Sequence, residues 1–146
     1  MQNTTNYKNT IVTLICYLYV ILFMYATTSK LLDFENFQIQ IGQSPVLSAF
    51  ANWISIIVPL SEVIISILLL IPKLRLVGLY AAYSLMALFT TYIYTILNYS
   101  DFIPCSCGGV LEKLSWNQHF IFNISFMVLA VIAIIIKPFP KYTRYN

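Results

Sequence analysis

The chain has 146 residues, of which 60% are hydrophobic and only 9% carry a charge. A typical soluble domain has about 25% charged residues, so the composition excludes an ordinary soluble fold and predicts an integral membrane protein. The net charge of +3 is small, and the basic residues form no cluster interleaved with aromatic residues. We therefore expect a lipid bilayer as the partner and no nucleic acid.

Four apolar runs are long enough to be transmembrane helices. They cover residues 11–28, 50–71, 76–97 and 119–136. Each has roughly the 20 residues that cross the hydrocarbon of a bilayer. The first run has some features of a cleaved signal peptide, but it lacks a clear small-x-small site and fades into Leu31 and Leu32, which favours a retained helix. We expect a single all-α domain over residues 1–146, an integral membrane four-helix bundle.

A mixed segment from Ser29 to Leu47 follows the first run. Leu31 and Phe34 fall on one helical face among charged and amide residues. This pattern predicts a short helix that lies at the membrane interface after the first span. The residues from Gly42 to Pro45 are expected to end it.

The start of the last helix has its own signal. Ser115 is followed three residues later by Gln118, which is the spacing of a capping box. This spacing predicts that the helix begins near Trp116.

Basic residues are divided unequally between the two ends of the predicted bundle. Of the eight Lys and Arg residues, those on the side of the termini and the second loop are Lys8, Lys73, Arg75, Lys137, Lys141 and Arg144. Only Lys30 and Lys113 lie on the other side. Because cytoplasmic loops carry an excess of Lys and Arg, both termini are expected in the cytoplasm. In a bacterial inner (cell) membrane, the loop with Cys105 and Cys107 then faces the periplasm or the exterior.

The last three helices carry polar and small residues at three- and four-residue steps, which place them on one face of each helix. These residues are Asn52, Ser55, Pro59, Glu62 and Ser66 in the second helix, Tyr80, Ser84, Ala87, Thr91, Tyr94 and Asn98 in the third, and His119, Asn123 and Ala130 in the fourth. Helix contacts in lipid use such residues, so these faces are expected to point inward. Glu62, Ser55, Tyr94 and Asn123 are the candidates for a polar core or a ligand-binding site.

Cys105 and Cys107 are the strongest candidates for chemistry. Thiols in an oxidising compartment tend to form disulfides, and a bridge between residues two apart is tight, which makes it more reducible. Gly108 and Gly109 let the backbone turn away and leave the sulfur atoms accessible. We expect a redox-active dithiol. The alternatives are a structural disulfide and a metal site that includes His119, although the spacing matches no strong zinc pattern.

Of three further candidate residues, Glu62 and His119 have two interpretations each. Glu62 lies about 18 Å from the outer end of its helix, near mid-membrane. There it either handles protons or a ligand, or hydrogen-bonds as a protonated group to Tyr or Ser of another helix. His119 either shuttles a proton for a thiol or merely begins the last helix at the interface. Cys16 lies near the cytoplasmic end of the first helix, out of reach of the other thiols, and is expected to be buried and inert.

Three groups of motifs, in their order and spacing, resemble those of a known family. They are Lys30-Leu31-Leu32-Asp33-Phe34 with Phe37 and Pro45, Pro59-Leu60-Ser61-Glu62 before Ile65 to Leu70, and Cys105-Ser106-Cys107-Gly108-Gly109 with residues 111–116. Together they look like the MauE/DoxX family of small four-helix membrane proteins, and the cysteine loop is similar to its redox-associated MauE-like branch. The resemblance extends from about Tyr7 to Ile136.

This resemblance implies a role in the redox maturation of exported proteins, with the chain as a component of a thiol–disulfide oxidoreductase. MauE members are linked to methylamine utilisation, where they are thought to help disulfide formation in the methylamine dehydrogenase light chain. Quinone-linked thiol oxidases relay electrons between two cysteine pairs, whereas this chain has one outward pair. A periplasmic thioredoxin-like protein, a substrate thiol protein or a quinone must therefore exchange electrons with it. The alternative is a non-catalytic scaffold or subunit whose CxC is a structural disulfide or a metal-binding loop.

Overall fold

The computed structural model describes residues 2–44, 47–99 and 115–137. They form α1 (Gln2–Leu32), α2 (Phe34–Gln43), a single 3₁₀ turn η1 (Ser48–Phe50), α3 (Ala51–Leu70), α4 (Arg75–Tyr99) and α5 (Trp116–Ile136). Four stretches are long and apolar enough to cross a membrane: Asn6–Leu32, Ser48–Leu70, Arg75–Tyr99 and Trp116–Ile136. The prediction of an all-α, membrane-type bundle is confirmed.

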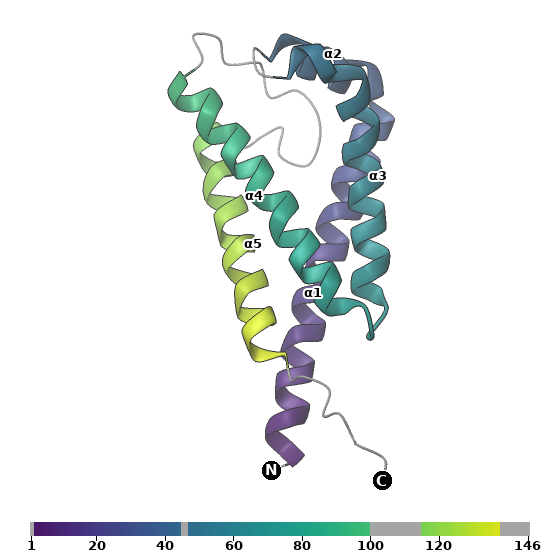
Figure 1. Cartoon of the computed structure of the whole chain (residues 1–146), viewed down its shortest axis with the longest axis vertical. Coiled ribbons are helices and arrows are strands. Elements are labelled where there is room, and N and C mark those ends of the chain that lie inside the picture. The colour runs from purple at the N-terminus through teal and green to yellow at the C-terminus, as the bar shows by residue number, and fades with distance from the viewer. Residues whose placement is uncertain (1, 45–46, 100–114, 138–146) are drawn as a thin grey trace.

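The helices are arranged as two arms that meet at one end (Figure 1). α1 packs along α3, and α4 packs along α5. α3 and α4 are joined by a short turn and separate toward the opposite end, where α2 lies against α3. Within the described residues, α5 contacts α4 and α1 but not α3. The short helix predicted after the first span is also confirmed.

The core lies where α1 meets α3, α4 and α5. One face of α1 buries Val12, Ile15, Cys16, Tyr19 and Phe23. The hydroxyl of Tyr19 donates a hydrogen bond to the backbone oxygen of Phe126 on α5, at 2.6 Å. A polar group inside a membrane bundle needs such a partner, because lipid supplies none. Cys16 is 1% exposed, which confirms its expected burial.

α3 and α4 approach most closely beside their connecting turn. A Cβ atom added to Gly78 would lie 3.0 Å from the backbone nitrogen of Leu69, so glycine is what lets the two backbones come this near. Arg75, at the start of α4, joins three helices there. Its Nε donates to the oxygen of Leu69 at 3.2 Å and its Nη1 to the hydroxyl of Thr13 at 2.7 Å.

The inward faces were predicted correctly for α3 and wrongly for α4. On α3 the predicted residues Ser55, Pro59, Glu62 and Ser66 are buried, and on α5 Asn123 and Ala130 are buried. Asn52, in the first turn of α3, is exposed instead, and its side-chain oxygen accepts a hydrogen bond from Gln38 of α2 at 2.6 Å. On α4, however, Tyr80 and Tyr94 are 55% and 49% exposed, and Ser84, Thr91 and Asn98 are exposed as well. The residues that α4 buries are Gly78, Leu79, Ala82, Met86, Ile93 and Ile96.

The exposure of the polar side chains on α4 has a local physical cause. The hydroxyls of Ser84 and Thr91 donate to the backbone oxygens of Tyr80 and Ala87, four residues earlier in the same helix. Such side chains are satisfied by their own helix, so they need no partner from a neighbour. The packing of α4 then follows Gly78 and the large apolar side chains instead.

The capping box at the start of α5 is confirmed. Ser115 Oγ accepts a hydrogen bond from the backbone N–H of Gln118 at 3.4 Å, and the Gln118 side chain accepts one from the N–H of Ser115 at 2.9 Å. Ser115 is therefore the N-cap and Trp116 the first helical residue. The two bonds satisfy backbone donors that the first turn leaves unpaired.

We expect Ser115→Ala to lower the free energy of unfolding by about 1 kcal/mol, since it removes the cap. Ser125→Ala is the matched control, because the hydroxyl of Ser125 is exposed and bonds only to the oxygen of Ile121 in its own helix. Circular dichroism during SDS titration in mixed micelles measures both. Equal losses in the two variants would contradict the capping role.

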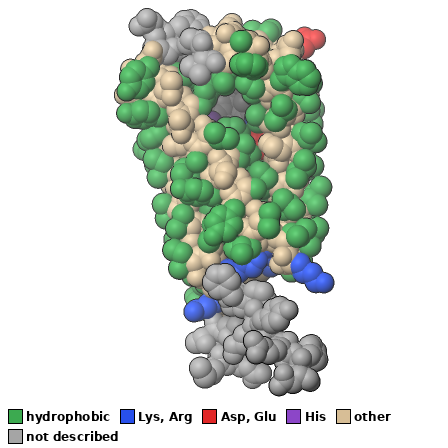
Figure 2. Space-filling model, viewed as in Figure 1, with side chains coloured by type: hydrophobic (Ala, Val, Ile, Leu, Met, Phe, Trp, Pro, Cys, Tyr) green, Lys and Arg blue, Asp and Glu red, His purple; other side chains and the backbone are tan. Residues whose placement is uncertain are grey.

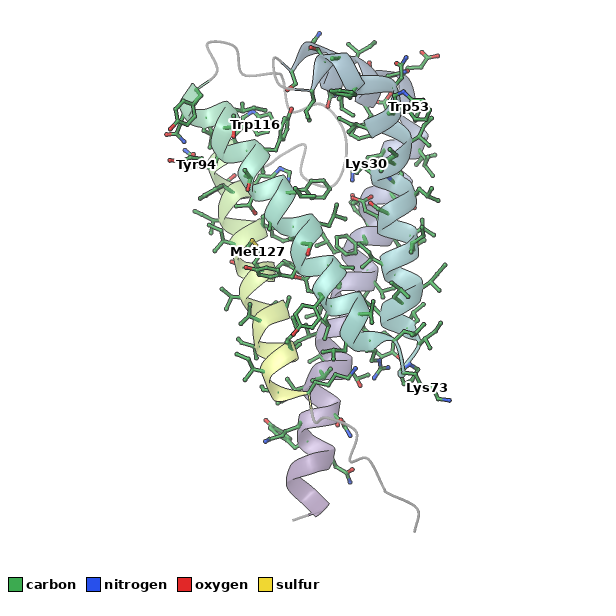
Figure 3. The ribbon with its side chains drawn as sticks, viewed as in Figure 1. Lys30, Trp53, Lys73, Tyr94, Trp116 and Met127 are labelled. Carbon is green, nitrogen blue, oxygen red and sulfur yellow. The ribbon has the colours of Figure 1, made fainter. Side chains whose placement is uncertain are left out.

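The two ends of the bundle differ in charge. Figure 2 shows Lys and Arg side chains gathered at the end where α1 begins and α5 ends. Lys73 lies at this end, whereas Trp53 and Trp116 lie at the opposite one (Figure 3). Tryptophan is enriched at membrane interfaces and basic residues at the cytoplasmic side. We call the two ends the basic end and the tryptophan end.

Candidate functional site

Glu62 forms a buried ion pair in the half of the bundle toward the tryptophan end. Its Oε1 is 2.5 Å from Nζ of Lys30, and the two side chains are 1% and 16% exposed. Its Oε2 accepts a hydrogen bond of 2.8 Å from the hydroxyl of Thr27, which is also buried. Both carboxylate oxygens are thus satisfied by α1. A charge buried in a membrane bundle requires such pairing.

Local sequence on α1 and α3 positions the pair. Thr27 and Lys30 are three residues apart, so they share one face of α1. Pro59 lies one turn before Glu62 and has no N–H, which frees the oxygen of Ser55 from the helical ladder. The backbone oxygen of Pro59 accepts a second, longer contact from Thr27 at 3.5 Å. α3 therefore presents a polar notch in an otherwise apolar helix.

Two aromatic rings flank the ammonium group of Lys30. Nζ lies 5.8 Å from the ring centroids of both Phe37 on α2 and Phe89 on α4. The faces of aromatic rings attract cations, more strongly when water is excluded. Figure 3 shows Lys30 on the inner side of α3, facing α4. The Lys30 side chain thus lies between the two arms. Among the described residues, its ammonium group donates a hydrogen bond to Glu62.

α5 carries polar groups on the other side of this space. His119 is half-buried. Asn123 lies one turn deeper on the same face and is 2% exposed. Its Nδ2 has no hydrogen-bond partner among the described residues. His119 is the only histidine in the chain, and Figure 2 shows a histidine side chain on this face of the molecule.

Comparison with protein families matches residues 8–136 to the family described as methylamine utilisation protein MauE. The chain belongs to the MauE family. No curated protein and no solved structure matches it significantly. Membership and the four apolar helices make it a multi-pass membrane protein associated with methylamine utilisation. The resemblance to MauE that the motifs suggested is confirmed.

In this MauE-family chain, three of the four residues that the sequence proposed for a polar core are buried. Ser55, Glu62 and Asn123 are buried as polar residues. The prediction that Tyr94 lines the polar core is wrong. Its ring lies on the exposed face of α4, near Tyr99 and with its centroid 6.5 Å from that of Phe120.

Cys105 and Cys107 lie outside the described residues, as does the metal site proposed to include them. In residues 2–44, 47–99 and 115–137, no three His, Cys, Asp or Glu side chains are close enough to hold a metal ion. The described cysteine, Cys16, is free and buried.

Sequence reasoning missed Lys30, Thr27 and Phe89. It used Lys30 as a charge flanking the membrane and as part of a family motif, and it expected Tyr or Ser as the partner of Glu62. A usable signal was present, because Thr27 and Lys30 share a helical face at the end of the first span. The neighbour of that face, however, is set by how the helices pack.

Proposed function

We propose that this MauE-family protein supports the thiol–disulfide redox maturation of exported proteins through Cys105 and Cys107. One observation carries the proposal. The segment with both cysteines joins Tyr99, where α4 ends, to Ser115, which caps α5. These two helix ends lie at the tryptophan end (Figure 1). Lys30, which pairs with Glu62, lies in the same half of the bundle (Figure 3), and His119 lies near the start of α5.

The division of charge supports an outward-facing cysteine pair. The basic end carries Lys73 and Arg75, and the tryptophan end is opposite. By the excess of positive charge in cytoplasmic loops, the basic end lies in the cytoplasm of a bacterial inner membrane. Residues 100–114 then face the periplasm or cell exterior, which is oxidising.

The reaction we infer is thiol–disulfide exchange. A thiolate of a periplasmic substrate or thioredoxin-like protein attacks the Cys105–Cys107 disulfide and forms a mixed disulfide. The second thiolate of the partner then attacks the partner's own sulfur in this mixed disulfide. This step forms a disulfide in the partner and leaves Cys105 and Cys107 as two thiols, so the partner is oxidised and the CxC is reduced. His119, at the first turn of α5, is suited to take up and return the proton of a thiol. Cys16 is buried in the core and takes no part.

Thiol trapping in intact cells tests the orientation and the redox state. With a membrane-impermeant maleimide, wild type is expected to be labelled only after reduction, whereas Cys107→Ser is labelled without reductant at Cys105. Cys16→Ser is the matched control and should behave as wild type does, since its sulfur is buried. Labelling that requires permeabilised cells would place the pair in the cytoplasm and contradict the proposal.

A second measurement separates the redox function from a scaffold. Cys105→Ser with Cys107→Ser is expected to leave exported thiol proteins of the host reduced, as judged by the gel shift of maleimide-treated proteins. If their disulfides form normally in this double variant, the CxC only shapes a docking loop. A metal-binding loop would instead show bound metal in the purified protein and unchanged substrate disulfides.

A further inference from the structure

We propose that the basic end of the bundle binds the headgroup of an anionic phospholipid through Lys8, Arg75 and Lys137. These residues belong to the start of α1, the start of α4 and the end of α5. The inference concerns a different end of the molecule from the ion pair of Lys30 and Glu62, and it does not depend on the proposed redox function.

The inward faces of α4 and α5 both reach the basic end at a cation. Arg75 lies three residues before the buried Gly78, and Lys137 lies four residues after the buried Ala133. Steps of three and four residues stay on one face of a helix. The N–H of Lys137 still donates to the backbone oxygen of Ala133 at 3.0 Å, so α5 fixes its position. Because α4 packs along α5, both half-buried cations belong to the region where the two helices meet.

α1 adds a third cation on the same side. Lys8 lies four residues before Val12, whose side chain is buried in the core, so the two share one face of α1. Arg75 also reaches α1 directly, since its Nη1 donates a hydrogen bond of 2.7 Å to the hydroxyl of Thr13. Figure 1 shows α1 beginning beyond the ends of α4 and α5, which leaves Lys8 exposed. Basic residues from three helices thus meet at this end.

The positive charge of this end is not balanced. Among the described residues, no carboxylate forms an ion pair with these cations. The chain has five acidic residues, and none lies in residues 1–32, 63–100 or 113–146, which include α1, α4 and α5. Burial lowers the pKa of the Lys137 ammonium, and the nearby Arg75 guanidinium acts in the same direction. Like charges repel strongly where water is scarce, so a bound anion would stabilise this arrangement.

A phosphate group suits these donors. Arg75 donates through Nε to the oxygen of Leu69 and through Nη1 to Thr13, whereas a guanidinium has five N–H groups in all. A phosphate presents several oxygens on one centre, and charge-assisted hydrogen bonds from Arg and Lys to such oxygens are strong. A single phosphate can therefore accept from the guanidinium and from both ammonium groups.

The depth of the site favours a lipid over a soluble phosphate. Arg75 is the first residue of one candidate span, and Lys137 directly follows another, so both lie at the level of lipid headgroups. Exposed side chains in the adjoining turns include the apolar Leu14, Val77 and Ile135. Acyl chains can cover this surface while the headgroup contacts the basic residues. A zwitterionic headgroup fits less well, because its own ammonium would approach the same cations.

Native mass spectrometry of the purified protein in a non-ionic detergent tests the site. The protein is titrated with phosphatidylglycerol and, separately, with phosphatidylcholine of the same acyl chains. We expect saturable binding of one phosphatidylglycerol and weaker binding of phosphatidylcholine. Lys8→Gln, Arg75→Gln and Lys137→Gln should each raise the dissociation constant for phosphatidylglycerol by about fivefold, the effect of one basic residue near an anionic lipid surface.

Lys73→Gln is the matched control. It removes the same charge at the same end, but Lys73 lies in the exposed turn between α3 and α4 and points away from the bundle (Figure 3). This variant should bind phosphatidylglycerol as wild type does. Equal weakening in all four variants would mean that the charge of the whole end attracts lipid without a site, and would overturn the inference. Equal binding of the two lipids by wild type would overturn it as well.

Two further measurements keep the result interpretable. Arg75→Gln also loses hydrogen bonds inside the bundle, so circular dichroism checks its fold, and Lys8→Gln and Lys137→Gln decide the outcome if it unfolds. Lys137→Arg keeps the charge and should bind as wild type does. Inorganic phosphate in excess should not displace the lipid. Displacement would assign the site to a soluble phosphate and contradict a lipid headgroup.

Discussion

Glu62→Ala is expected to lower the free energy of unfolding by about 3–5 kcal/mol, the usual cost of removing one partner from a buried ion pair. The substitution leaves the Lys30 ammonium, 16% exposed, without its carboxylate, and the hydroxyl of Thr27 without its acceptor. Glu62→Gln should cost less, because the amide oxygen still accepts from Thr27. SDS titration in mixed micelles, followed by circular dichroism, measures each loss.

Comparison with a variant that lacks both charges shows whether the loss comes from leaving one charge unpaired. Lys30→Met/Glu62→Met should be more stable than Glu62→Ala, since it leaves no charge unpaired in the bundle, and apolar replacement of a buried pair is often neutral or stabilising. If the double variant is no more stable than the single one, the pair does not hold α1 to α3. The loss would then come from the cavity that the shorter side chain leaves.

Gly78→Ala is expected to destabilise the protein by about 1–3 kcal/mol, the typical cost of overpacking. The added Cβ would lie 3.0 Å from the backbone nitrogen of Leu69 and as near to its Cδ2. A side chain can change rotamer, but the backbone of α3 can only move away. α3 and α4 would then separate beside their turn, where Arg75 also bonds to the oxygen of Leu69.

Gly42→Ala is the matched control for this prediction. It makes the same change in a helix, but its Cβ would meet only Ala51 Cβ, at 4.0 Å, which is an ordinary contact. The higher helix propensity of alanine, worth up to about 1 kcal/mol, should make it neutral or stabilising. The midpoints of thermal unfolding in detergent compare the two variants. A loss of similar size in both would mean that the close approach of α3 and α4 is not what Gly78 provides.

Local patterns in the sequence were enough for the helices and for the inward faces of α3 and α5. The number of spans follows from the length of the apolar runs, since a chain in lipid must satisfy its backbone within each helix. The start of α5 follows from Ser115 and Gln118, whose two bonds lie within one turn. The inward face of α3 follows from Glu62, because a carboxyl group among apolar residues has to avoid lipid.

The face of α4 and the partners of Glu62 depended on tertiary structure. Ser84 and Thr91 look like core residues by spacing, yet their hydroxyls bond to their own helix, and the close contact of Gly78 with Leu69 turns the other face inward. Lys30 is 32 residues from Glu62 in the chain. Periodicity shows which residues share a face of one helix, whereas the packing of α1 on α3 decides which face meets it. The charged pair exists because that packing excludes lipid and water from both groups at once.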